Sequence, residues 1–377
     1  MQLKNILPAA FVAGAAAQSL TDVLAANNST LSSLTSLISA NPSLLEALGS
    51  AQNITILAPS NDALAGFLNS TAGAAAATDP GAVAALLTYH VLNGTYPASA
   101  FTNTSQFIPS LLTNSSFTNV TGGQVVEARL RGETVSIFSG LLSASNVSVA
   151  NVNFTGGVVH VIDTVLTVPQ SASNTAGALN LTSLAGALTT AGLVETVDSL
   201  ADVTIFAPSN EAFQAIGSAL PNLSTEALSG ILTYHVVQGT VGYSTLLTNT
   251  TLPTVNGGNV TISIVNGSVF VNSAKVTVPD VLVAGGVVHV IDGVLNPNNT
   301  SAAPPTASTT SPAFPGVSSG TDLPFTSGVS ASTTVTSVPT RDPEATSSST
   351  AGAAPMQTGM IGLGALFGGA AIVMGNL

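Results

Sequence analysis

The sequence predicts an α+β fold built from two copies of one domain, and three observations support this prediction. Three sequence blocks occur twice in the same order, each copy opens with segments of helical periodicity, and each copy closes with short β-type segments between Gly-Gly pairs. Helices in the first half and strands in the second half favour an α+β domain over an alternating βαβ arrangement. The chain of 377 residues is long enough for two such domains and additional segments.

The repeated blocks define the boundaries of the two copies. They pair residues 53–64 with 202–213, residues 86–95 with 231–240, and residues 156–166 with 285–295. We therefore expect domain 1 at residues 18–169, a linker rich in Ser, Asn and Ala at 170–177, and domain 2 at 178–297. The first copy is longer, mainly between its second and third blocks, which predicts loop insertions around residues 99–119.

Periodicity and capping residues predict the elements of each copy in order. Residues 19–48 and 181–200 show Leu and Ile at helical spacing, and residues 54–57 and 203–206 are predicted strands that end at Ala-Pro. The predicted helix N-caps are Ser60, Asp79, Ser209 and Ser224, with Pro80 at a first helical position. The later predicted strands are residues 135–138, 147–149 and 158–162 in the first copy, and 260–264, 269–271 and 287–291 in the second.

The N-terminus has the pattern of a secretory signal peptide. Lys4 precedes an apolar run from Ile6 to about Ala15, and alanines at 15–17 provide the small residues that cleavage requires. We therefore predict a signal peptide at residues 1–17. A buried first helix is the alternative interpretation.

The C-terminus has the pattern of a glycosylphosphatidylinositol (GPI) attachment signal. The chain is apolar from Met360 to Leu377, and a spacer and a cluster of small residues precede this tail. We predict the signal's spacer and hydrophobic tail at residues 355–377, with Ser349, Ser348 or Gly352 as the attachment residue. A transmembrane helix is the alternative, but no basic residues follow the apolar run. The expected location is the cell surface, with the protein anchored in the plasma membrane by its lipid.

Residues 298–354 are rich in Ser, Thr, Pro, Ala and Gly, and this composition does not support a packed core. We expect a disordered, O-glycosylated stalk there. Asn-X-Ser/Thr sequons are frequent in the chain, which agrees with a secreted glycoprotein. The candidate N-glycosylation residues are Asn27, Asn53, Asn93, Asn114, Asn146, Asn180, Asn222, Asn249, Asn266 and Asn299.

Composition excludes several classes of function. With 5 Lys+Arg against 17 Asp+Glu, the formal net charge is −12, and the few cations cannot form the basic surface that nucleic-acid binding requires. The chain has no Cys, which excludes disulfide scaffolds, thiolate metal sites and cysteine nucleophiles.

The four histidines all belong to the repeated blocks, and we interpret them as structural. His90 and His235 continue the apolar stripe of a predicted helix, which places them in the core. His160 and His289 lie three residues before an Asp in a predicted strand, so the two side chains point to opposite faces and cannot chelate one metal. We therefore predict no metal site.

A hydrolase could in principle use Ser, His and Asp residues that recur in both copies. These are Ser60, His90 and Asp163, and Ser209, His235 and Asp292. However, Ser60 is better explained as a helix cap, and no Gly-X-Ser-X-Gly elbow surrounds it. We expect no enzymatic activity, no catalytic residue and no cofactor.

The three blocks resemble the conserved segments of fasciclin (FAS1) domains. The resemblance is found in three segments of the second copy, each with its counterpart in the first copy. They are Thr-Ile-Phe-Ala-Pro-Ser-Asn-Glu-Ala-Phe at 204–213, Leu-Thr-Tyr-His-Val-Val at 232–237 and Gly-Gly-Val-Val-His-Val-Ile-Asp at 285–292. Together with the signal peptide, stalk and lipid anchor, the chain resembles fungal or plant fasciclin-like surface glycoproteins. The resemblance implies a helical bundle packed on a β wedge, and adhesion or matrix interaction without catalysis.

The resemblance also implies an adhesion motif at Tyr89-His90 and Tyr234-His235 with their branched aliphatic neighbours. Because periodicity places the histidines inside, we expect the two tyrosines to be the better surface candidates. The integrin tripeptide is not present at the corresponding Arg131-Gly132-Glu133, and the flanking cysteines of matrix members are absent.

We expect a non-enzymatic surface glycoprotein for adhesion or cell-wall and matrix interaction. Its expected partners are surface, wall or matrix proteins or glycans, with homophilic association as a further option and no nucleic acid. The alternatives are a small-ligand or glycan-binding surface protein, and a passive glycosylated wall spacer.

Overall fold

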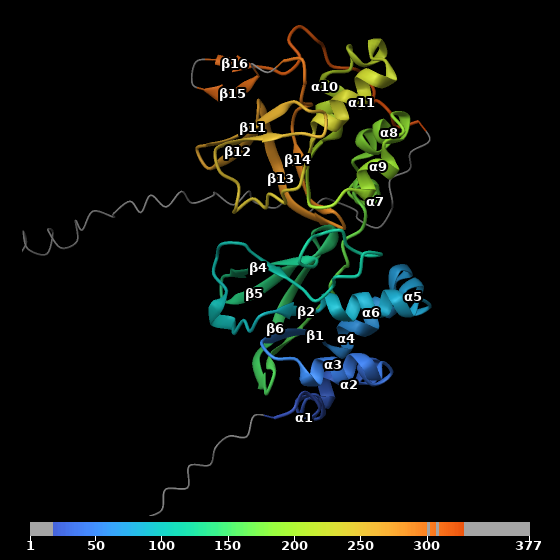
Figure 1. Cartoon of the computed structure of the whole chain (residues 1–377), viewed down its shortest axis with the longest axis vertical. Helices are drawn as coiled ribbons and strands as arrows, with labels where there is room; N and C mark the ends of the chain where they lie inside the picture. Colours follow the sequence, from blue (N-terminus) through green and yellow to red (C-terminus); the bar gives the residue numbers. More distant parts are fainter. Residues whose placement is uncertain (1–17, 300–301, 307–308, 328–377) are drawn as a thin grey trace, which may run out of the picture.

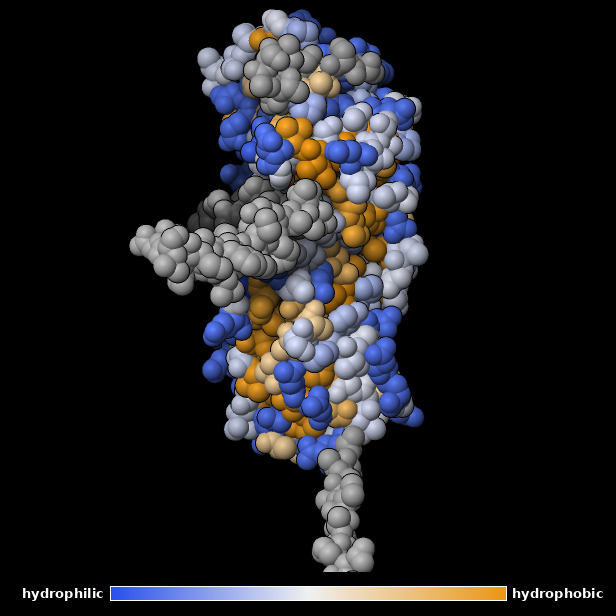
Figure 2. Space-filling view, turned by 90° about the vertical axis from the view of Figure 1, so that its left-hand side faces the viewer, coloured by the Kyte–Doolittle hydropathy of each residue, from blue (hydrophilic) through white to orange (hydrophobic). Residues whose placement is uncertain are grey.

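The computed structural model describes residues 18–299, 302–306 and 309–327. The predicted signal peptide, the anchor candidates Ser348, Ser349 and Gly352, and the 355–377 tail lie outside the described residues. Two domains follow one another along the long axis, each with its helices on one side and its strands on the other (Figure 1). This arrangement confirms the predicted α+β fold in two copies. From the side of the strands, hydrophobic residues are visible along both domains between hydrophilic margins (Figure 2).

Domain 1 has helices mainly in its first half and strands mainly in its second half. Its helices are α1 (Leu20–Ala26), α2 (Asn28–Ser39), α3 (Pro42–Ser50), α4 (Asn61–Leu68), α5 (Thr71–Ala77) and α6 (Pro80–Tyr89), with short 3-10 turns η1 (Ala98–Ala100) and η2 (Gly140–Leu142). Its strands are β1 (Ile54–Pro59), β2 (Val91–Asn93), β3 (Gln106–Pro109), β4 (Val125–Arg131), β5 (Thr134–Phe138), β6 (Ala144–Phe154) and β7 (Gly157–Ile162).

Domain 2 repeats this order with shorter helices. Its helices are α7 (Ala172–Ala178), α8 (Thr182–Thr190), α9 (Val194–Ser199), α10 (Asn210–Ala215), α11 (Thr225–Tyr234) and the 3-10 turn η3 (Leu220–Asn222). Its strands are β8 (Val203–Pro208), β9 (Val236–Gln238), β10 (Thr250–Pro253), β11 (Asn259–Val265), β12 (Ser268–Val271), β13 (Ala274–Val283) and β14 (Gly286–Ile291). The hairpin β15 (Ala303–Thr306) and β16 (Thr309–Ser311) follows.

The two seven-stranded sheets have the same topology. The strand order is β2-β1-β7-β6-β5-β4-β3 in domain 1 and β10-β11-β12-β13-β14-β8-β9 in domain 2. Only the central pairs β1–β7 and β14–β8 are parallel, and the other neighbours are antiparallel. Register shifts in β6 and β13 mark bulges, and bulges bend a strand. Each long strand therefore bridges the two halves of a wedge-shaped sheet.

The Gly-Gly pairs allow the parallel strands to approach closely. Gly157 and Gly286 have φ angles of 155° and 151°, which L side chains rarely adopt. A Cβ atom at Gly157 would lie 1.8 Å from the carbonyl oxygen of Ile54, and one at Gly286 would lie 2.1 Å from that of Val203. Only glycine fits at these positions, which explains why the motif occurs in both copies.

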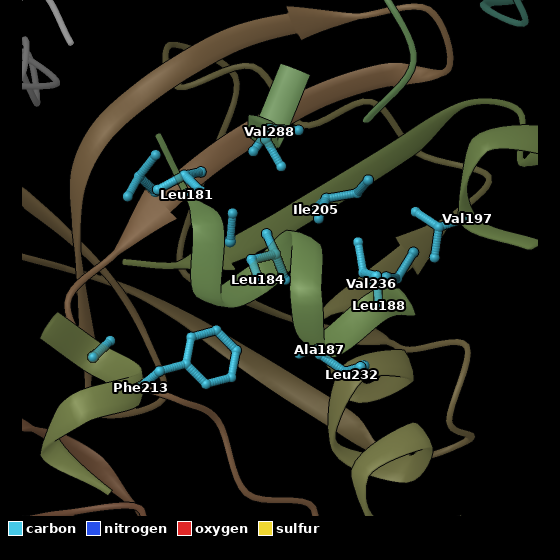
Figure 3. Close-up of a cluster of buried hydrophobic side chains, with 14 of the residues drawn as sticks. Leu181, Leu184, Ala187, Leu188, Val197, Ile205, Phe213, Leu232, Val236 and Val288 are labelled. Carbon is cyan, nitrogen blue, oxygen red and sulfur yellow. The ribbon is translucent and has the colours of Figure 1, made fainter. Parts of the chain in front are cut away.

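Each domain has one apolar cluster between its helices and the sheet and another inside the wedge. In domain 1, Leu31 and Val159 belong to the first cluster, and Ile137 belongs to the second. In domain 2, side chains of α8 pack against Ile205 of β8 and Val288 of β14 (Figure 3). The predicted N-caps are confirmed, because Ser60, Asp79, Ser209 and Ser224 each accept a backbone N–H of the following helix turn.

The predicted linker at 170–177 belongs largely to a helix instead. Ser171 caps α7, and Thr175, Ala176 and Ala178 of this helix are buried. The composition misled the prediction, because a short helix of small residues resembles a linker. Domain 2 therefore begins at its cap, as domain 1 begins with Ser19 capping α1.

Part of the segment predicted as a disordered stalk, residues 298–354, is folded instead. Residues 312–327 lie on domain 2, where Phe314, Val317 and Phe325 pack against its core. These apolar side chains provide burial that the average composition of the segment conceals. Residues 328–354 lie outside the described residues. Among the residues that the structure describes, no helix has the length and hydropathy needed to cross a membrane.

Candidate functional site

The histidine of each Tyr-His pair ends a helix and ties it to the strand side of the domain. The ring of His90, the C-cap of α6, is 2.7 Å from the carbonyl oxygen of Leu86 through Nδ1 and accepts the backbone N–H of Leu166 at Nε2, 3.0 Å away. His235 has the same contacts with Ile231 and Leu295, at 2.8 and 2.9 Å. Because Nε2 accepts a hydrogen bond from a backbone N–H, the neutral ring carries its own hydrogen on Nδ1 and donates it to the carbonyl oxygen.

Burial keeps these two histidines uncharged. Their exposed fractions are 4% and 3%, and desolvation lowers the pKa of both His90 and His235 to about 4. The prediction that they are buried structural residues is confirmed. A neutral, fully hydrogen-bonded imidazole inside the core has no lone pair left for chemistry.

The second pair of histidines is also buried, with the opposite tautomer. His160 Nε2 lies 2.8 Å from the carbonyl oxygen of Tyr96, and Nδ1 accepts the N–H of Asn151 at 3.2 Å. His289 makes the same two contacts with Gly242 and Asp280, at 2.8 and 3.2 Å. Burial lowers the pKa of His160. The His160 ring thus connects the loop at Tyr96 to the bulged strand β6, and the His289 ring connects the loop at Gly242 to the bulged strand β13.

The tyrosines are buried, which corrects the expectation that they are the better surface candidates. Tyr89 is 0% exposed and donates its hydroxyl to the carbonyl oxygen of Val125 at 2.9 Å. Tyr234 is 1% exposed; its hydroxyl donates to Asn259 at 2.6 Å and accepts the amide of Asn272 at 3.2 Å. Each helix ends at its tyrosine, so the ring enters the wedge interior. The four residues Tyr89, His90, Tyr234 and His235 therefore form no contact surface in this structure.

The residues of the hydrolase hypothesis have structural partners. Ser60 and Ser209 accept the N–H groups of Ala63 and Ala212 as helix caps, while both nitrogens of His90 and His235 are already hydrogen-bonded. Asp163 accepts the N–H of Asn146, and Asp292 accepts that of Lys275. Within the described residues, no group of three or more His, Cys, Asp or Glu side chains could hold a metal ion.

The two domains are joined by hydrogen bonds between residues that the sequence analysis did not single out. Asp202 of domain 2 accepts the N–H of Thr121 at 2.8 Å and its hydroxyl at 2.5 Å. The fully buried Gln124 donates its amide to the carbonyl oxygen of Val283 at 3.0 Å, and the N–H of Asn119 donates to Ala284 at 2.7 Å. A pattern within one repeat does not reveal contacts between repeats.

Apolar contacts complete this interface. Phe107 of β3 stacks on Tyr243 with ring centroids 4.2 Å apart and an interplanar angle of 12°. Val125 of domain 1 packs with Leu282 and Val287 of domain 2 in the same cluster. Leu142 of η2 extends into the core of domain 2. Buried aromatic, aliphatic and hydrogen-bonded groups of both domains hold the pair together as one unit.

A cleft lined by both polar and apolar residues opens beside the interface, with a volume of about 480 Å³. Its walls come from both sides of the domain junction and include Phe117, Asn119, Gln170, Asn174 and Asp198. Amide and carboxylate groups next to an aromatic ring can hydrogen-bond and stack with a polar ligand.

The candidate glycosylation residues lie at the periphery of the structure. Asn27 and Asn299 are half-buried, and the amide of Asn27 donates to the carbonyl oxygen of Val23 at 2.8 Å. The other eight are exposed: Asn53, Asn93, Asn114, Asn146, Asn180, Asn222, Asn249 and Asn266. Glycosylation at these residues stays a prediction.

Comparisons with known proteins agree with the repeated blocks. Residues 29–169 and 179–297 match the fasciclin domain family. A fasciclin-like arabinogalactan protein of Arthroderma benhamiae is 38% identical over 297 residues, covering 78% of this chain and 70% of that protein. Another from Cercospora beticola is 31% identical, covering 78% and 82%. A solved FAS1 domain pair from the insect cell adhesion molecule Fasciclin I aligns with 74% of this chain and 100% of its own length, at 19% identity and a TM-score of 0.36.

Proposed function

Because this chain belongs to the fasciclin domain family, we propose that it is a non-enzymatic surface glycoprotein that mediates adhesion or cell-wall and matrix attachment. The single observation that carries the proposal is the joined domain pair, which offers two copies of one module at a fixed spacing. Two weak contacts held at a matching distance bind more tightly than either contact alone. The hydrophobic residues visible along both domains in Figure 2 support a protein or wall contact on that face.

The proposal extends to location. A signal peptide at 1–17 and a lipid anchor at Ser349, Ser348 or Gly352 would place the domain pair outside the cell, at the end of a glycosylated stalk. The partners would be surface, wall or matrix proteins or glycans, or other copies of the protein. Many anchored copies on one surface would add to the avidity of each weak contact.

Attachment of cells to walls or to one another tests the proposal. Cells that lack the protein are compared with cells that display it, and with cells that display a chimera in which an unrelated folded module replaces residues 18–327. We expect attachment only with the native domains. Equal attachment with the chimera would favour the passive-spacer alternative, and no difference among the three would contradict adhesion.

A matched pair of variants tests whether fixed spacing matters. Asn53 and Asp202 occupy the same repeat position with positive φ angles of 58° and 51°, but Asn53 accepts an N–H within domain 1 while Asp202 holds Thr121 across the interface. With N-glycans removed from both variants, Asp202→Ala should weaken attachment more than Asn53→Ala. Equal attachment would mean that the domains act independently.

Glycan binding is a second candidate, favoured by the cleft of about 480 Å³ at the domain junction, whose lining combines the aromatic ring of Phe117 with the amides of Asn119 and Gln170. A cleft-binding oligosaccharide would raise the thermal stability of the purified protein in proportion to its concentration and affinity. Substituting Asn119→Ala and Gln170→Ala should remove that shift. Thermal unfolding with cell-wall oligosaccharides, in the presence and absence of these substitutions, provides the measurement.

A further inference from the structure

The C-terminal segment of the chain occupies a slot between the helices of domain 2. The N–H of Gly320 donates to the carbonyl oxygen of Gln214 at 2.8 Å, and the N–H of Ser218 donates to that of Ser318 at 3.1 Å. Phe325 meets Phe213 of α10 edge to face, with ring centroids 6.0 Å apart. An extended stretch of chain thus binds through its backbone and inserts one aromatic ring between α8 and α10.

Two glycines make room for this segment. A Cβ atom at Gly186 of α8 would lie 1.7 Å from the carbonyl oxygen of Phe325, and one at Gly217 would lie 2.4 Å from the nitrogen of Gly320. Glycine is unfavourable inside a helix, but at position 186 of α8 any larger residue would collide with the backbone of Phe325. Domain 2 is therefore shaped to accept its own C-terminal segment.

Domain 1 has a cavity at the equivalent position, lined in part by Ala76 and Ala77 of α5, and none of the described residues of the C-terminal segment enters it. Leu37 aligns with Ala187, because Ser33 and Ser183, four residues before each, donate the same N–H to Asn61 and Asn210. The first two repeated blocks, extended by a few residues, also align Leu64 with Phe213, Phe67 with Ile216, Leu68 with Gly217, Val83 with Leu228 and Leu86 with Ile231. These six domain 1 side chains line a cavity of about 140 Å³, which we call the domain 1 groove. Leu68 at its rim is 51% exposed and is therefore accessible to a ligand.

The size and lining of the domain 1 groove match one aromatic ring. An apolar cavity of about 150 Å³ lined by Leu, Ile and Phe stays dry and binds benzene. The described lining of the domain 1 groove has that character and volume, with Ser33 as its polar residue. Ser36 and Leu68 replace Gly186 and Gly217, so a peptide backbone must lie farther from the helices than it does on domain 2. Insertion of a side chain is therefore the main contact available.

We propose that the domain 1 groove is a docking site for an extended peptide that inserts one aromatic side chain, with the chemistry of the Leu323-Pro324-Phe325 turn. The argument is that this chain already places such a turn in the equivalent slot of domain 2. The inference rests on the proposed adhesive function, because it assigns a contact site to one of the two modules.

Binding of a labelled peptide to the full chain tests the proposal. The probe is a fluorescent synthetic peptide of residues 318–327, and fluorescence anisotropy measures its affinity. We expect saturable binding at one site, weakened at least about tenfold by Leu68→Asp, which corresponds to about 1.4 kcal/mol. The matched control is Leu246→Asp, because Leu246 is 66% exposed on domain 2 and lies outside the groove. A peptide carrying Phe325→Ala should not bind.

A second variant checks the equivalence of the two slots. Phe325→Ala in the protein itself removes the ring from the domain 2 slot and weakens the hold of the segment there, so a peptide that carries Phe325 should compete for this slot and bind the variant at a second site. Self-association of the protein that Leu68→Asp abolishes and the peptide inhibits would also support the proposal, with a second copy as the source of the turn.

Three results would overturn the proposal. These are no binding up to about 1 mM peptide, equal affinity for Leu68→Asp and Leu246→Asp, and an alkyl or fatty-acid ligand in the groove that the peptide does not displace. Peptide binding is measured in solution without cells. Normal peptide binding with no cell attachment would therefore contradict only the proposed function, and the reverse result would contradict only the docking site.

Discussion

Domain 1 and domain 2 share the hydrogen bonds of their histidines and helix caps, and they differ in their outer contacts. In both, a buried histidine ends the helix of the second repeated block and accepts the N–H of the last residue of the third block. A serine caps the helix after the first strand of each domain. The slot between the helices differs, because Leu64 and Leu68 border an open groove in domain 1 whereas Phe213 and Gly217 receive Phe325 in domain 2. The comparison separates residues that maintain the fold from positions that have been adapted to a contact.

The same separation appears at the start of the first repeated block. Asn53 accepts the N–H of Thr95 within domain 1, whereas Asp202 accepts two groups of Thr121 from the other domain. Both domains have a hydrogen-bond acceptor with a positive φ angle at this position. Its partner lies in the same domain for Asn53 and in the other domain for Asp202. The position was therefore available for building the interface without altering the fold.

Replacing the capping histidines should produce the largest effect and test whether the framework is equivalent in the two domains. His90→Ala and His235→Ala each leave a buried N–H and a buried carbonyl oxygen without their ring partner, and each creates a cavity. We expect each to cost about 4 kcal/mol of unfolding free energy in its own domain. Hydrogen exchange resolved by domain measures both losses of unfolding free energy. A cost below about 1 kcal/mol in either domain would contradict the equivalence of the two histidines.

Acidification should affect the two domains in parallel. Both histidines have a folded-state pKa of about 4, below the ordinary value of 6.5, because burial disfavours the charged ring. The unfolded chain therefore binds protons first as the pH falls below 6.5, and stability declines until about pH 4. The expected loss is about 3 kcal/mol per histidine. Denaturant unfolding at pH 7, 5.5 and 4 checks this, and a flat profile between pH 6.5 and 4 would contradict it.

One alanine substitution should have opposite signs in the two domains. Ser36→Ala in α2 and Gly186→Ala in α8 both improve helix propensity, by up to about 1 kcal/mol for glycine. At Gly186, however, the new Cβ would meet the carbonyl oxygen of Phe325 at 1.7 Å. We expect Ser36→Ala to be neutral or slightly stabilising, and Gly186→Ala to cost about 1–2 kcal/mol by displacing the C-terminal segment. Faster hydrogen exchange of the Gly320 and Ser218 N–H groups in Gly186→Ala alone would confirm the mechanism.

The elements predicted from sequence are those whose signal is local. Helix caps at Ser60 and Ser209, the first strand of each copy and the burial of His90 all follow from residue type and short-range spacing. Helix α7 escaped prediction because seven small residues carry no hydrophobic periodicity. The contacts of Asp202 and of Phe325 connect residues far apart in sequence, so no local pattern could reveal them.

The orientation of the tyrosines shows where periodicity fails. Tyr89 and Tyr234 are the last residues of their helices, and the chain turns into β2 and β9 directly after the histidines. A projection onto a continuing helix therefore misplaces the rings, which enter the wedge instead of facing solvent. Because both tyrosines are buried, substitutions at these positions should change the unfolding free energy and leave cell attachment unchanged.

Removing the tyrosine hydroxyls should give a graded difference in stability between the two domains. Tyr89→Phe loses one hydrogen bond, to Val125, whereas Tyr234→Phe loses one to Asn259 and one from Asn272. We expect costs of about 1 and about 2 kcal/mol in unfolding free energy, respectively. Cell attachment should be unchanged in both variants, because neither hydroxyl reaches the surface. Reduced attachment at unchanged stability would mean that these side chains contact the partner. The Tyr-His pairs would then be contact residues and not part of the framework that the two domains share.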